Sequence, residues 1–104
     1  MDLRQMKYFT TIVEQGTISK AAKVLHMAQP PLSIQLKQLE DELGVVLIKR
    51  GNHQIELTQA GTTFYKRCLQ ILDLSEIARN EMKQSYQERE VSKGIQLIQI
   101  KNIQ

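Results

Sequence analysis

Residues 18–43 hold the pattern that most constrains the fold, because two short helical repeats of apolar residues flank a tight break. In the first repeat, Ala21, Ala22 and Leu25 recur at helical spacing, and the two alanines allow a close approach of a neighbouring helix. Two helices this short cannot bury their apolar faces alone. They must pack on each other and on further helices, so the segment predicts a helix-turn-helix unit.

The second helix of this unit is predicted to begin at two adjacent prolines. Pro30 and Pro31 suit the first turn of a helix, where backbone amides have no helical partner. The apolar stripe that follows repeats at steps of four, three and four and ends before Gly44: Leu32, Leu36, Leu39 and Leu43. The opposite face would point outward: Pro30, Ile34, Lys37 and Asp41. A face offered in this way is typical of a helix that reads the major groove of DNA.

Two further elements are predicted on either side of this unit. Apolar residues at three- and four-residue steps predict a supporting helix that ends near Gly16: Leu3, Met6, Phe9, Ile12 and Val13. Residues 45–48 and 55–57 resemble short strands, and Gly51-Asn52 between them suits a turn with positive φ. These strands predict a small β-hairpin, or wing.

A long helix is predicted from Thr58, which suits an N-cap, to about Glu90. No proline occurs there, and one stripe repeats at alternating steps of four and three: Phe64, Cys68, Ile71, Ser75, Ala78 and Met82. A helix of about thirty residues would be about 45 Å long, too long for the small domain to cover. We expect half of it to pack on a second copy, with a dimer interface made by five residues: Phe64, Cys68, Ile71, Ala78 and Met82.

In this order, the motifs resemble the amino-terminal part of the LysR-type transcriptional regulators. The resemblance covers residues 1 to about 90 and is carried by three runs: Gly16-Thr17-Ile18-Ser19-Lys20-Ala21-Ala22, Ala28-Gln29-Pro30-Pro31-Leu32-Ser33 and Leu57-Thr58-Gln59-Ala60-Gly61. So many matched positions at fixed spacing are far more specific than one short motif.

The resemblance implies a mainly α fold in three parts. They are a winged helix-turn-helix of three helices and a hairpin at residues 1–58, with the helix-turn-helix at 18–37; a linker and dimerisation helix at 59–90; and a hinge at 91–104 with the start of a missing effector domain. Residues 93–100 alternate like a first strand of that domain. The implied function is sequence-specific binding of double-stranded DNA by a bacterial transcriptional regulator, as a homodimer or higher oligomer. A small-molecule effector is implied only if the parent protein has a carboxy-terminal domain.

The resemblance also places the start of the third helix in the major groove, through five residues: Gln29, Pro30, Pro31, Ser33 and Ile34. Gln29 can pair with an adenine edge, Ser33 can bond to a phosphate or a base, and Lys37 can neutralise a phosphate. The alternative for each is an ordinary solvated helix surface. Lys37 lies near the acidic run 40–42, which we expect to face away from DNA or to weaken binding.

Two positions depart from the family pattern. Ile34 stands where many members carry arginine, and an isoleucine directed away from the leucine stripe could contact a thymine methyl. In the wing, the candidate DNA contacts are Arg50, which matches the family, and His53, which stands where another cation is common. A single histidine on a turn is either plain solvated surface, the commoner case, or a phosphate contact that depends on pH. The wing therefore carries few cations that could neutralise phosphates. Because each neutralised phosphate adds about 0.9 to the slope of log affinity against log salt, we expect the affinity for DNA to depend only weakly on salt.

Composition alone supports these expectations weakly. The net charge of the 104 residues is +3, and residues 1–57 carry seven basic and six acidic side chains. No pattern typical of an enzyme, a metal site or a cofactor site occurs: His26 and His53 lack second-ligand spacing, and Cys68 has no nearby histidine. We therefore expect no catalysis, no metal and no cofactor. A single cysteine and the lack of a long apolar run favour the cytoplasm and no membrane partner.

Two other interpretations remain open. The winged helix could be a scaffold in a protein-interaction module whose functional surface is the long helix. The chain could also act by pairing with full-length subunits of a related regulator.

Overall fold

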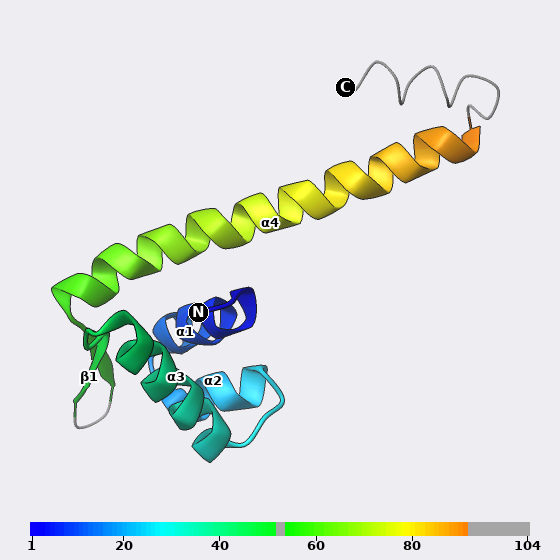
Figure 1. Cartoon of the computed structure of the whole chain (residues 1–104). Helices are drawn as coiled ribbons and strands as arrows, with labels where there is room; N and C mark the ends of the chain where they lie inside the picture. The colour runs from blue at the N-terminus through cyan, green and yellow to red at the C-terminus, as the bar shows by residue number, and fades with distance from the viewer. Residues whose placement is uncertain (52–53, 92–104) are drawn as a thin grey trace. The chain divides into compact units, whose positions relative to one another are not determined.

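A computed structural model describes residues 1–51 and 54–91, with side chains as far as residue 86. The elements in chain order are α1 (Leu3–Gln15), α2 (Ile18–Val24), α3 (Gln29–Leu43), β1 (Ile48–Arg50), β2 (Ile55–Leu57) and α4 (Gln59–Val91) (Figure 1). Three helices, a hairpin and a long fourth helix confirm the predicted architecture. The predicted strand at 93–100 lies outside the described residues.

The chain divides into two compact units, Met1–Leu72 and Asp73–Gln104. The first unit holds α1 to β2 together with the first turns of α4. In the second unit, the described residues are the continuation of α4 to Val91.

Local sequence signals set the ends of the first two helices. Asp2 Oδ1 accepts a hydrogen bond from the Gln5 N–H at 2.7 Å, and this bond caps α1. Thr17 Oγ1 caps α2 in the same way, from the Lys20 N–H at 3.1 Å. Gly16 ends α1 with a φ of 82°, which confirms the glycine as the stop signal. Each boundary is therefore determined by residues within a few positions of it.

The helix α3 also follows its sequence signals. It begins at Gln29 with both prolines in its first turn, and it ends at Gly44, whose φ is 73°. The predicted stripe is buried at Leu32, Leu36 and Leu39, and Leu43 is half-buried. The outer face of α3 is therefore free for a partner, as the pattern predicted.

The wing is a two-stranded antiparallel hairpin in which Ile48 lies opposite Leu57. The prediction that its first strand covers 45–48 was wrong, because β1 begins at Ile48. The preceding backbone is bonded elsewhere: Glu40 Oε2 accepts from the Leu47 N–H at 2.7 Å, and the Leu47 carbonyl accepts from the Thr58 N–H at 3.0 Å. These bonds hold the segment to α3 and to the start of α4, so it cannot extend the ladder.

Gly51 has a different role from the one predicted. Its φ is not positive, so the expected left-handed turn is absent at this residue, and Asn52 lies outside the described residues. A Cβ at Gly51 would lie 2.7 Å from the Gln54 carbonyl oxygen, whereas the Gly51 N–H donates to that oxygen at 3.1 Å. Glycine is needed here for close approach of two backbone segments.

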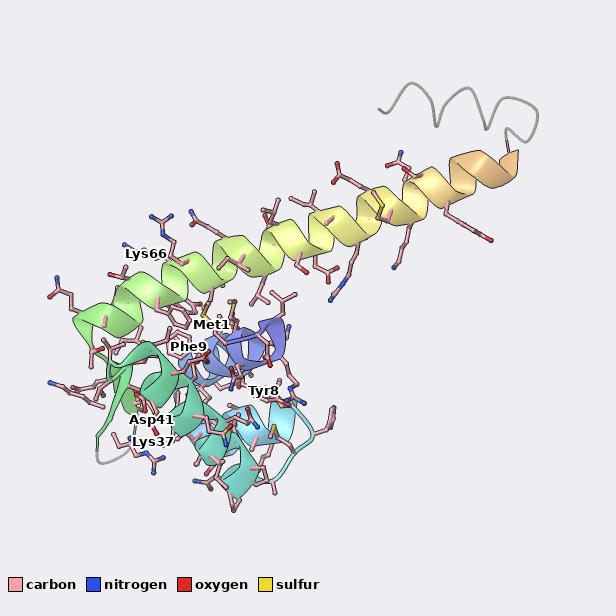
Figure 2. All side chains as sticks on the ribbon, viewed as in Figure 1. Met1, Tyr8, Phe9, Lys37, Asp41 and Lys66 are labelled. Carbon is pink, nitrogen blue, oxygen red and sulfur yellow. The ribbon has the colours of Figure 1, made fainter. Side chains whose placement is uncertain are left out.

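The core of the first unit joins α1, α3 and the first turns of α4. The Phe9 ring lies 5.4 Å from that of Phe64 and 6.4 Å from that of Tyr65, measured between centroids. Figure 2 shows Phe9 between α1 and the start of α4. Six side chains are the largest of those fully buried: Phe9, Ile12, Leu32, Leu39, Leu47 and Cys68.

Cys68 corrects part of the predicted dimer interface. Its thiol is 0% exposed, so its assignment to a surface between copies was wrong. The first turns of α4 are covered within the same chain, and Phe64 is half-buried there for the same reason. Burial also raises the pKa of the Cys68 thiol to about 11, so the thiol stays protonated at neutral pH. Cys68 is a packing residue.

Candidate nucleic-acid interface

The predicted contact residues of α3 lie together on its outer surface. Gln29, Pro30 and Pro31 are exposed in the first turn, and Ile34 is 55% exposed one turn later. Lys37 is also exposed, and Ser33 is half-buried at the edge. We define this surface as the reading face, made of six residues: Gln29, Pro30, Pro31, Ser33, Ile34 and Lys37. It contains polar groups and one large apolar side chain, a mixture that can both hydrogen-bond and contact methyl groups.

Gln29 is held by a residue that the sequence did not single out as a contact. Ser19 Oγ, in α2, donates a hydrogen bond to Gln29 Oε1 at 3.0 Å, and both side chains are exposed. Ser19 and Gln29 are ten positions apart, with the turn of the helix-turn-helix between them. No local periodicity marks this pair, because the approach of the two helix starts depends on the angle at which α2 and α3 pack.

The wing meets the reading face at a shallow hollow of about 180 Å³. Its walls come from the start of α2, the start of α3 and both strands, and they include Ser19, Gln29, Arg50 and Gln54. The Ile55 N–H donates to the Gly16 carbonyl at 3.0 Å and ties the wing to the end of α1. Arg50 therefore lines the same hollow as Gln29, together with Gln54, a residue that no sequence motif marks. His53 lies outside the described residues.

Lys37 is paired within the chain. Its Nζ lies 2.8 Å from Asp41 Oδ1, one turn along α3, and both side chains are exposed (Figure 2). The hydrogen bond to Asp41, followed by the charge of that carboxylate, raises the pKa of Lys37. The ammonium is therefore charged at neutral pH, but Asp41 competes with a phosphate for it.

The other two acidic residues of the run 40–42 bond elsewhere. Glu40 accepts from the backbone that leads into the wing, and Glu42 contacts the amino group of Met1. Neither of these carboxylates is paired with the reading face. The expected weakening of DNA binding by this run therefore rests on Asp41.

The described part of the chain holds neither a metal-binding cluster nor a membrane-spanning helix. Between residues 1–51 and 54–91, no group of three or more His, Cys, Asp or Glu side chains is arranged to hold a metal ion. None of the helices described combines the length and the apolar character that crossing a membrane requires.

The order of these elements agrees with one known family. The family model described as "Bacterial regulatory helix-turn-helix protein, lysR family" matches residues 3–62. The chain belongs to the LysR family. Its LysR-family relatives include the HTH-type transcriptional regulator BsdA of Bacillus subtilis, 54% identical over 85% of this chain and 31% of BsdA. The regulator ClcR of Pseudomonas putida is 46% identical over 76% of this chain and 27% of ClcR. The chain thus spans less than a third of the length of these relatives.

Solved structures confirm the LysR-type fold. A crystal structure of a CbnR DBD–DNA complex is similar with a TM-score of 0.79 and 41% identity, over 83% of this chain and 99% of that one. A BenM DBD in complex with catB site 1 DNA has a TM-score of 0.79 and 38% identity, over 81% of this chain and 94% of that one. The predicted fold, a winged helix-turn-helix with a long helix, is therefore correct for this LysR-family chain.

Proposed function

We propose that this LysR-family chain binds double-stranded DNA in a sequence-specific manner, as part of a bacterial transcriptional regulator, with α3 in the major groove. The observation that carries the proposal is the reading face. Its residues are exposed in the first half of α3, while Leu32, Leu36 and Leu39 anchor the opposite side of the helix in the core. A rigid helix with a free polar and apolar face fits the major groove, which admits one α-helix. The similar CbnR and BenM domains were crystallised with DNA.

Each contact has a proposed task. Gln29 bonds to a base edge, Ile34 contacts a thymine methyl, and Pro30 and Pro31 shape the start of the helix beside the bases. Ser33, being half-buried, bonds to a phosphate or a base at the edge of the reading face. In addition, Lys37, Arg50 and His53 contact phosphates and orient the domain.

We further propose that the chain works as a homodimer or higher oligomer through α4. Leu74 and Met82 are each 66% exposed, and Ile71 is 37% exposed. With Ala78 they follow one another at steps of three, four and four, which is the spacing of an apolar stripe that pairs with another helix. Two reading faces on spaced half-sites would multiply the discrimination that one domain provides.

The function of the parent protein follows from these proposals. Bacterial DNA lies in the cytoplasm, so the regulator would act there. We propose a binding function without catalysis, and an effector site only in the further length that the relatives possess. The relatives BsdA and ClcR are both named as transcriptional regulators.

Selection of sites from a random duplex library, followed by fluorescence anisotropy, tests the proposal. We expect the selected duplex to bind at least about a thousandfold tighter than a scrambled duplex of the same length and composition. Equal affinity of the folded chain for both duplexes would overturn sequence-specific binding. Retention of a protein partner in place of DNA would instead support the interaction module.

A further inference from the structure

The contact between Ser19 and Gln29 has no evident structural purpose. Ser19 is near the start of α2, but the cap of that helix is the Thr17 hydroxyl, which bonds to the Lys20 N–H. The Ser19 hydroxyl instead donates to Gln29 Oε1 at 3.0 Å, on the surface of the first unit. Because both groups are solvated, the bond contributes little to folding. Its effect is to hold the Gln29 side chain.

Holding Gln29 before DNA arrives alters its binding in two ways. An exposed glutamine samples many rotamers, and contact with a base must select one of them. A bond already made in the free protein lowers that entropic cost. In the bond that the structure shows, Oε1 is directed to α2, and Nε2 has no hydrogen-bond partner among the described residues. The group left for DNA is therefore mainly a donor.

The donor orientation favours some bases over others. Adenine offers the N7 acceptor in the major groove, and guanine offers N7 and O6, whereas cytosine offers its N4 donor. The free Nε2 can donate to either purine. If the Gln29 amide were rotated by 180°, Oε1 would face the bases and could accept a hydrogen bond from cytosine N4. The Ser19 bond therefore disfavours cytosine at the position that Gln29 reads.

The hollow beside Gln29 gives its side chain room to turn toward the wing. The hollow of about 180 Å³ lies beside the amide, and Arg50 and Gln54 line it from the wing. Both carry N–H donors that could attract Gln29 Oε1 away from α2. Without the Ser19 hydroxyl, the amide would have space and alternative partners toward the wing.

We propose that Ser19 is a positioning residue that orients the Gln29 amide with its donors toward the bases, and so sets a preference for a purine over cytosine at the position read by Gln29. The inference rests on the proposed function, since it concerns how the reading face discriminates.

The test uses the whole chain and a panel of duplexes with each base pair at each position of the selected site. At each position we compare the affinity for a purine with the affinity for cytosine, as a ratio. The position read by Gln29 is the one at which Gln29→Ala abolishes this difference in affinity. At that position we expect Ser19→Ala to lower the ratio about two- to tenfold, the range expected for freeing one ordered side chain. Affinity for scrambled DNA and the ratios at other positions should not change. Ser19→Thr, which keeps the hydroxyl, should restore the ratio.

A double variant separates positioning from direct contact. If Ser19 acts through Gln29, Ser19→Ala in the Gln29→Ala background should have no further effect on any base ratio. A further loss in the double variant, or an equal loss of affinity for selected and scrambled DNA, would show a direct DNA contact and overturn the inference. So would an unchanged ratio in Ser19→Ala, or no effect of Gln29→Ala at any position. The proposed function fails separately, if the unmodified chain itself prefers no sequence.

Discussion

The two ends of α4 show what helical periodicity can and cannot reveal. In the first unit, Cys68 is fully buried and Phe64 packs on Phe9. From residue 73 to residue 86, every side chain is exposed except the half-buried Ser75, although Leu74 and Met82 continue an apolar pattern. The apolar residues of one helix are therefore covered within the chain at one end and exposed at the other. Periodicity shows which side of a helix is apolar, but the covering surface depends on what lies opposite.

The largest effect is expected at the covered end. Phe9→Ala removes a ring that is 1% exposed and contacts both Phe64 and Tyr65, so the cavity should lower the free energy of unfolding by about 3 to 5 kcal/mol. Urea denaturation followed by circular dichroism measures it. Leu74→Ala, at an exposed site in the second unit, is the matched control and should cost far less in a dilute sample. If Phe9→Ala and Leu74→Ala lowered the free energy of unfolding by similar amounts, the covered and exposed ends of α4 would not differ in their contribution to stability.

The uncovered end should instead determine assembly. Leu74→Glu places a charge in the proposed helix-pairing stripe, and Ile71→Glu does so at its less exposed start. We expect a folded monomer that binds the selected duplex about tenfold or more weakly, because one half-site no longer assists the other. Light scattering gives the mass, and anisotropy gives the affinity. Arg79→Gln, which changes a residue outside the stripe, is the control and should remain a dimer. If both glutamate variants also remained dimers, this stripe would not be the interface.

An exposed apolar residue in the first unit should behave differently from those of α4. Ile34 is 55% exposed on the reading face, so Ile34→Arg should change the free energy of unfolding by only about 0.5 kcal/mol or less. At the base pair that it contacts, the preference should move from thymine toward guanine by about 1 to 3 kcal/mol. Titrations with single-base variants of the site measure this shift. An unchanged order of preference would show that Ile34 does not touch the bases.

The smallest effect concerns two similar ion pairs, one in each unit. Asp41→Asn releases Lys37 from a 2.8 Å pair on the reading face, and Glu76→Gln releases Arg79 from a 2.8 Å pair in the second unit. The freed Lys37 should neutralise about one further phosphate and steepen the slope of log affinity against log salt by about 0.9. The control variant has the same change of charge and should leave the slope unchanged. If Asp41→Asn and Glu76→Gln had the same slope of log affinity against log salt, Lys37 would not be a phosphate contact.

Much of the fold could be predicted because its signals are local. The caps at Thr17 and Thr58, the glycine stops at Gly16 and Gly44, and the prolines that open α3 each act within a few residues. The exposed reading face followed from the leucine stripe for the same reason. The wing was less predictable, since β1 begins later than its β-branched residues indicate. Bonds from Glu40 and Thr58, both distant in sequence from the strand's start, decide that position.

The amino-acid sequence by itself determined the helices, their ends, the family and the residues that face outward on α3, because helical spacing and capping are short-range properties of the chain. Tertiary structure alone decided that Cys68 belongs to the core, that Arg50 and Gln29 line one hollow, and that the Ser19 hydroxyl bonds to the Gln29 amide. These relations join residues on different elements. They depend on the angles and distances at which the elements pack, and no periodicity within one element encodes those quantities.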